Sequence, residues 1–306
     1  MLRYIVNRLI LSVPVIIAVL ILVFLFIHLI PGDPVEMMLG ETATPANIEE
    51  IRHMLGLDKP LGVQFIDFFK NLLKGDLGES IFSRRPVMQL VMERYPATLK
   101  LAFASALIAL LISIPLGILA AVHHYSWIDN VSMVFALLGV SMPNFWLGPL
   151  LIILFSLVLG WLPPSGYGGI SYIILPALTL GTSMSASLTR LVRSSMLEVL
   201  DQEYIKTARS KGLREKLVIY RHALRNALIP VVTVFGMQIG ALLSGALITE
   251  TIFSWPGIGR LFIEAIFRRD FPLVQGCVLV IAITYVLINL IVDITYGFIN
   301  PRIRYE

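Results

Sequence analysis

The sequence has few charged residues and a single cysteine. Charged residues make up 14% of its 306 positions and hydrophobic residues 57%, against about 25% and 45–50% in a soluble domain. A water-soluble fold of this length could not bury that much apolar surface, so lipid must be part of the solvent. One cysteine, Cys277, excludes an internal disulfide framework and a cysteine-rich metal site. Because it lies in an apolar run, we interpret it as a small buried side chain.

Several catalytic and binding patterns are also absent. The net charge of +4 is too small to suggest nucleic acid as a partner. The five histidines are scattered, and no His-Glu-x-x-His run is present, which argues against an intramembrane metallopeptidase. Ten-residue segments of alternating polarity, which are typical of transmembrane barrels, do not occur. The sequence therefore predicts an all-α, polytopic membrane protein.

Six apolar segments are long enough to cross a bilayer, which takes about 20 residues. They are Leu9–Ile30, Ala97–Val122, Ser132–Leu157, Tyr172–Leu188, Leu228–Ile248 and Gln275–Ile299. The first is too long for a signal-peptide core and lacks a cleavage site, so we interpret it as a retained span. Pro143 interrupts the third, for which we favour one kinked span over two half-helices.

Basic residues predict the orientation of these spans. The loop from Arg190 to Arg225 holds nine basic and four acidic residues in 36 positions, whereas Pro31–Pro96 holds seven and ten. Because positive charge stays on the cytoplasmic side, both termini are expected in the cytoplasm. The acidic segment then lies outside, where Thr44-Pro45 predicts the start of one helix, with Gly56 as its stop, and the aromatic stripe Phe65–Leu72 predicts a second, ended near Gly75.

The long cytoplasmic loop, residues 190–227, is highly patterned. Leu197, Leu200, Tyr204 and Ala208 recur at helical spacing up to Gly212, and a second series of apolar residues continues from Leu213 to Leu228 at intervals of three and four. The spacing predicts two amphipathic helices joined at Gly212. The pattern alone leaves two interpretations open, a docking element and a basic helix lying on lipid head groups.

The same loop resembles the coupling-loop signature of ABC importer permeases. The residues that carry the likeness run from Glu203 to Gly212 and from Arg221 to Pro230. The general form is Glu-Ala-Ala, three residues, then Gly. This sequence keeps Ala208 and Gly212 but has Lys206 and Thr207 in place of the first two residues, a departure common in the dipeptide/oligopeptide/nickel branch.

Further matches to that branch follow in order along nearly the whole chain. They are Arg3-Tyr4, Arg8-Leu9, Pro31-Gly32-Asp33-Pro34, Gly75-Asp76-Leu77-Gly78, Pro96-Ala97-Thr98-Leu99, Glu250 to Arg260, and Asn300 to Arg304. The short outer segment and the ending Asn-Pro-x-Ile-Arg-Tyr are similar to glutathione-type members.

The resemblance implies a type I ABC importer permease fold with six transmembrane helices. Residues 1–96 would form the first helix and an external helical segment, and residues 97–306 the transmembrane domain. It also implies a second, related permease subunit, two cytoplasmic ATPase subunits and an external solute-binding protein, in a bacterial cytoplasmic membrane. The chain has no Gly-x-x-x-x-Gly-Lys-Ser/Thr loop, so ATP would be used by the partner subunits and no cofactor or metal bound here.

The implied function is import of peptides, with dipeptides, oligopeptides and glutathione all open. A nickel chelate is the alternative within the family, and a stand-alone secondary transporter the alternative outside it. A membrane-bound enzyme is third, because no paired acids or metal ligands are evident. The residues expected to seat in an ATPase groove are Glu203, Tyr204, Thr207, Ala208, Arg209, Lys211 and Gly212.

Polar residues within spans are candidates for the translocation path. Asn144, Thr233, Gln238 and Ser244 could line it, although hydrogen bonding between helices is favoured for them. Asp293, which we take for the one acid inside an apolar segment, is expected to snorkel or to pair with Arg302. Phe253, Trp255 and Pro256 face outside; anchoring at the membrane interface is the common interpretation of such aromatics, and the resemblance suggests an external gate.

Overall fold

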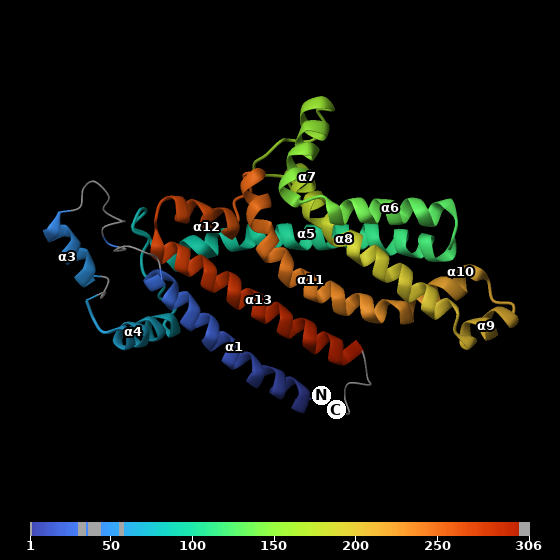
Figure 1. Cartoon of the computed structure of the whole chain (residues 1–306), viewed down its shortest axis with the longest axis horizontal. Helices are drawn as coiled ribbons and strands as arrows, with labels where there is room; N and C mark the ends of the chain where they lie inside the picture. Colours follow the sequence, from blue (N-terminus) through green and yellow to red (C-terminus); the bar gives the residue numbers. More distant parts are fainter. Residues whose placement is uncertain (1, 30–34, 36–43, 55–57, 300–306) are drawn as a thin grey trace.

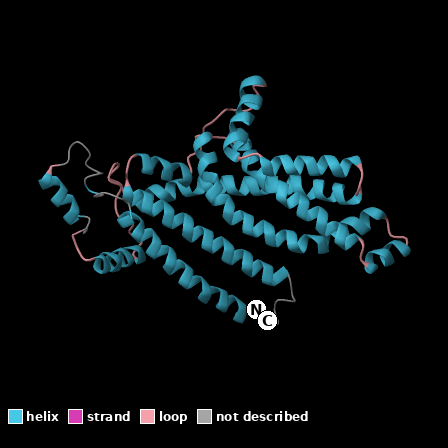
Figure 2. Cartoon of the chain, viewed as in Figure 1, coloured by secondary structure: helices cyan, strands magenta, loops and turns pink. Residues whose placement is uncertain are grey.

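The computed structural model describes residues 2–29, 35, 44–54 and 58–299, and these residues form helices joined by short loops (Figure 2). The helices are α1 (Leu2–Leu29), α3 (Pro45–Met54), α4 (Leu61–Leu73), α5 (Val87–Val122), α6 (Trp127–Ser141), α7 (Asn144–Leu151), the π-helix η2 (Ile152–Val158), α8 (Ile170–Leu200), α9 (Glu203–Ser210), α10 (Glu215–Leu217), the π-helix η3 (Val218–Ala223), α11 (Leu224–Ile252), α12 (Ile258–Phe267) and α13 (Phe271–Ile299). Within the described residues no β-strand forms, which confirms the all-α class.

Four of these helical stretches are long and apolar enough to cross a membrane unbroken. They lie in α5, in α8, in the stretch from Glu215 to Leu242, and in α13. The bent pair α6 and α7–η2 counts as one further crossing, and Leu9–Leu25 of α1 is a shorter apolar helix. Six apolar segments therefore correspond to the six that the sequence predicts, and the third of them is a bent pair and not one unbroken span.

The third segment is not a single kinked helix, as we expected, but two half-helices. Their axes differ by 108°. Pro143 cannot donate a backbone N–H and disfavours helical backbone in the residue before it. Met142 and Pro143 are accordingly extended, with ψ of 114° and 142°. Figure 1 shows α7 projecting away from the axis of α6.

The core of the molecule is the contact between α5 and α8. Leu101 on α5 and Leu188, Val192 and Met196 on α8 are fully buried in one cluster that continues into the loop after α8. This burial explains why α8 continues to Leu200, well beyond the predicted span end at Leu188. Its last three turns are amphipathic and pack on protein rather than on lipid.

The segment between α1 and α5 contains two helices, of which α4 packs against α1. α3 begins at Pro45 and α4 ends at Leu73, as predicted, while the expected stop at Gly56 lies outside the described residues. Phe68 and Leu72 of α4 contact Leu20 and Val23 of α1. In Figure 1, α3, α4 and α12 lie at one end of the bundle and α9 and α10 at the opposite end.

Candidate functional site

The loop between α8 and α11 contains a short helix held between two spans. α9 follows a break at Asp201 and Gln202, so the predicted first helix of the loop is in fact the end of α8 plus α9. Gly212 is the expected joint: its φ of +73° is a left-handed conformation that costs other residues about 1–2 kcal/mol. Beyond it, α10 and η3 continue into α11 without a break, so the predicted second helix is the beginning of the fifth span.

One face of α9 is buried and the other is polar and exposed. Ile205 and Ala208 are buried against Val218 and Ile219 of η3. The small side chain of Ala208 therefore permits close packing within this chain. The other predicted coupling residues, Glu203, Tyr204, Thr207, Arg209, Lys211 and Gly212, are exposed. They form a continuous polar surface at the end of the bundle.

Three polar links fix α9 to its neighbours. Asn226 of α11 donates to the hydroxyl oxygen of Tyr204 at 2.7 Å. Arg209 donates to both carboxylate oxygens of Glu215, at 2.7 and 3.3 Å, and so spans the turn at Gly212. These bonds lower the pKa of Glu215 and raise that of Arg209. Both partners are about half exposed, so the pair directs geometry more than it stabilises the fold.

An ion pair with a buried carboxylate lies beside this segment, and no sequence pattern predicts it. Arg193 of α8 donates from Nε to Oδ1 of Asp129 at 2.6 Å and from Nη2 to Oδ2 at 2.7 Å. Asp129, in the first turn of α6, is 2% exposed and also accepts from the Tyr125 backbone N–H. The pair locks α6 to the stretch of α8 that carries α9.

At the opposite end, the predicted gate residues form part of a packed junction. Phe253 and Trp255 are 1% and 2% exposed, so the interface-anchoring interpretation is wrong for them. Pro256, between buried neighbours, is half-buried. The Trp255 indole donates to the backbone oxygen of Ala97 at 2.8 Å, and its ring meets that of Tyr167 edge-on. Trp255 is buried because it bonds to α5, and Phe253 is buried close to Gly148 of α7, so neither ring faces lipid.

The same junction contains a buried acid that we missed. Glu250 is fully buried at the end of α11, so Asp293, whose side chain lies outside the description, is not the one acid in an apolar segment. Thr98 donates to Glu250 Oε1 at 2.7 Å and accepts from the Ile258 backbone N–H at 2.8 Å. A Cβ at Gly257 would fall 2.1 Å from Oε1 of this carboxylate, so any other residue there would force the bonded Glu250 side chain to move.

Two of the predicted path residues lie together, and a third, Thr233, does not join them. Asn144 at the start of α7 and Gln238 of α11 line a cavity of about 250 Å³ between α7, α8 and α11. Gln238 also donates to Ser187 of α8 at 2.7 Å, the interhelical bond that we favoured. Thr233 bonds within its own helix, to the Ile229 carbonyl. The side chain of Ser244 lies outside the description.

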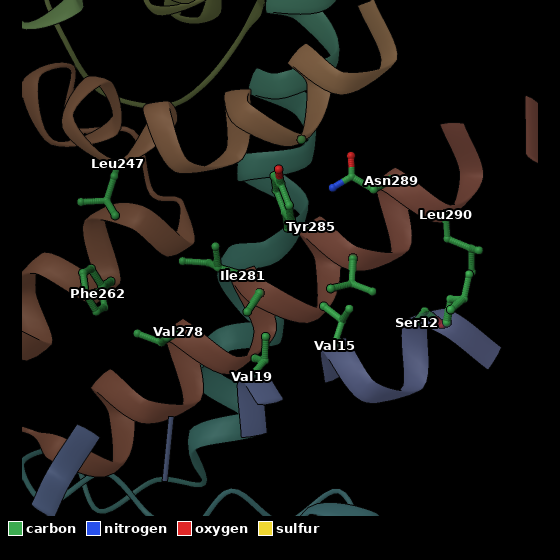
Figure 3. Close-up of a pocket in the computed structure, with 14 residues that line it drawn as sticks. Ser12, Val15, Val19, Leu247, Phe262, Val278, Ile281, Tyr285, Asn289 and Leu290 are labelled. Carbon is green, nitrogen blue, oxygen red and sulfur yellow. The ribbon is translucent and has the colours of Figure 1, made fainter. Parts of the chain in front are cut away.

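A larger groove, of about 880 Å³, lies over α13 between α1 and α11 (Figure 3). Its lining is hydrocarbon except at Ser12, Tyr285 and Asn289, and Phe262 of α12 closes one end. Hydropathy does not predict this groove, because apolar residues that line a groove have the same hydropathy as apolar residues that face lipid. Its chemistry matches lipid tails and not a polar solute.

Comparisons with known proteins assign this arrangement to a family. The family model described as "Binding-protein-dependent transport system inner membrane component" matches residues 113–305, and its N-terminal companion matches residues 1–102. The chain is 46% identical, over the full length of both proteins, to the glutathione transport system permease protein GsiC of Pectobacterium atrosepticum. It is 44% identical, again over both full lengths, to GsiC of Escherichia coli K12.

Solved structures show a similar fold at low sequence identity. The inward-facing MetNI methionine ABC transporter matches with a TM-score of 0.58 at 17% identity, covering 70% of this chain and 97% of that one. An amino acid ABC transporter with histidines matches with a TM-score of 0.52 at 18% identity, covering 70% and 94%. The fold predicted from the sequence is confirmed.

Proposed function

We propose a function from one premise: this chain belongs to the family of binding-protein-dependent transport system inner membrane components. It is a permease subunit of an ABC importer for peptide-like solutes, with the type I permease fold. The finer proposal is that it imports glutathione or short peptides into the cytoplasm, which the full-length identity of 46% to a glutathione permease supports.

The observation that carries the mechanism is the anchoring of α9. A part that transmits movement between subunits must be rigid and must be joined to the elements that it moves. Ile205 and Ala208 pack on η3, the start of the fifth span, and Tyr204 is bonded to Asn226 of α11. Movement imposed on the exposed polar face would reach both α8 and α11.

The remaining partners follow from this role. Two ATPase subunits would hydrolyse ATP and close against each other below the membrane, each seating one coupling helix. A second permease subunit would complete the channel, and a solute-binding protein would deliver substrate at the end that carries α3 and α12. Both termini would be in the cytoplasm, in keeping with the density of basic residues between Arg190 and Arg225.

Transport itself is tested with the complete importer in proteoliposomes. Labelled glutathione, a dipeptide, a tripeptide and a nickel chelate are offered in turn, with and without ATP inside. We expect ATP-dependent uptake of glutathione or a short peptide. Uptake of the nickel chelate alone would move the assignment to that branch of the family, and uptake by the permease alone, without ATPase subunits, would contradict the mechanism.

The contact of α9 with the ATPase is tested by cross-linking. The chain's one native cysteine, Cys277, is fully buried, so it interferes little with thiol probes. Thr207→Cys on the exposed face of α9 should cross-link to an ATPase subunit. The control is Phe267→Cys, which is 84% exposed at the far end of the bundle and should not. Equal cross-linking of both variants, or of neither, would refute the assignment.

A further inference from the structure

The cavity lies between α7, α8 and α11, and its lining includes both Asn144 and Gln238. Gln238 is the central residue of α11, which extends 14 residues to either side of it. Apart from Asn144, Gln238 and the two serines Ser183 and Ser187, the cavity walls are apolar. The volume of about 250 Å³ corresponds to roughly eight water molecules in the liquid.

Two hydrogen-bond acceptors in this cavity have no donor among the described residues. They are Oδ1 of Asn144 and Oε1 of Gln238, and both atoms are buried. Leaving a buried acceptor unbonded costs about 1–3 kcal/mol. Interhelical bonding accounts for the amide nitrogen of Gln238, which donates to Ser187. It does not supply a donor to the amide oxygen of either Asn144 or Gln238. Both oxygens belong to residues that line the same cavity, so a donor from a molecule in that cavity is the one that could reach them after a small side-chain rotation.

We propose that Asn144 and Gln238 form a binding subsite that accepts hydrogen bonds from the N–H groups of a peptide during its passage. The inference rests on the proposed function and deepens it. Both acceptors are neutral amide oxygens, and no charged residue lines the cavity. A neutral acceptor pair suits peptide N–H groups, because it binds them without the strong attraction that would hold an ion. A solute must leave a transport site as readily as it enters.

The test compares glutathione with an analogue in which both peptide nitrogens are methylated and cannot donate. Uptake of each compound by the reconstituted importer is measured with the binding protein saturated. The uptake ratio is the rate for glutathione divided by the rate for the methylated analogue. Asn144→Leu removes one acceptor at similar size. Because one neutral hydrogen bond is at stake, the ratio should be about 3- to 10-fold lower in Asn144→Leu than in the native importer.

The second measurement is the melting temperature of the variant, which a purely structural role of Asn144 predicts to fall and the binding subsite does not. Replacing an unbonded buried acceptor by hydrocarbon removes a penalty, so Asn144→Leu should leave the melting temperature unchanged or raise it. Gln238→Met is the second variant and should lower the same ratio, although it also loses the bond to Ser187. The matched control is Ser113→Ala in α5, outside the cavity. It removes an unbonded buried hydroxyl and should not change the uptake ratio.

The outcomes separate this inference from the proposed function. If the native importer takes up glutathione but Asn144→Leu leaves the ratio unchanged, the cavity holds only solvent and the subsite is refuted. A melting temperature lowered together with uptake of both probes would also refute it, because a structural contact explains that result. If the native importer takes up neither probe, the proposed substrate class is wrong and the subsite falls with it.

Discussion

Removing Arg193 should destabilise the protein more than removing any exposed arginine of the same helix. Asp129 would lose two charge-assisted donors and remain buried with only the Tyr125 backbone N–H. Breaking a fully buried pair costs about 3–5 kcal/mol. Because the Arg193 side chain is 23% exposed, water screens part of the charge, and we expect about 2–4 kcal/mol for Arg193→Ala.

The assay is thermal unfolding of the purified permease in detergent, with coupled ATPase activity of the complex as a second measurement. The expected loss corresponds to a fall of roughly 5–12 °C in melting temperature. The control is Arg190→Ala, an exposed arginine three residues earlier, which should change stability by about 0.5 kcal/mol or less. Asp129→Leu combined with Arg193→Met should recover most of the loss, because no uncompensated charge remains. Equal melting temperatures for Arg193→Ala and Arg190→Ala would refute the reasoning.

Three further changes test the two ends of the bundle. Gly212→Val places a β-branched residue at a φ of +73°, so about 1–2 kcal/mol of strain should loosen α9 and reduce uptake per ATP hydrolysed; unchanged coupling would contradict this. Thr98→Val removes the hydroxyl that donates to Glu250 and should lower stability by about 1–3 kcal/mol in thermal unfolding, whereas no change would mean that the junction is hydrated. Arg209 lowers the pKa of Glu215, so their ion pair is complete above the ordinary carboxyl pKa of 4.5 and is lost as the pH falls through the lowered pKa of Glu215. Hydrogen exchange in α9 should become faster over that pH range. In Glu215→Gln, exchange in α9 should already be faster at pH 7.

The membrane class and most helix positions could be predicted from the sequence, because they depend on local composition and spacing. The Thr44-Pro45 start of α3 is an example, since proline fixes the backbone that a first helical turn needs. The joint at Gly212 is another, because the apolar period stops there. The end of α8 was misjudged, since hydropathy falls at Leu188 while the helix continues on a buried face to Leu200.

The functional residues were predicted less completely, for two reasons. Hydropathy reports that a residue avoids water but not whether it meets lipid or protein, so Phe253 and Trp255 could not be recognised as buried. The pairing of Asp129 with Arg193 joins positions 64 residues apart, and no spacing rule reaches that far.

The sequence by itself determined that this chain is a helical membrane protein, where most of its helices lie, and that the loop between α8 and α11 carries a patterned segment broken at Gly212. Those properties follow from short-range periodicity and from the free energy of placing side chains in lipid. Only the tertiary structure decided which polar groups meet, Arg193 with Asp129 and Thr98 with Glu250, and that Asn144 and Gln238 line one cavity. These contacts depend on how distant helices pack, which is set by the shape of the whole bundle and not by neighbours in the chain.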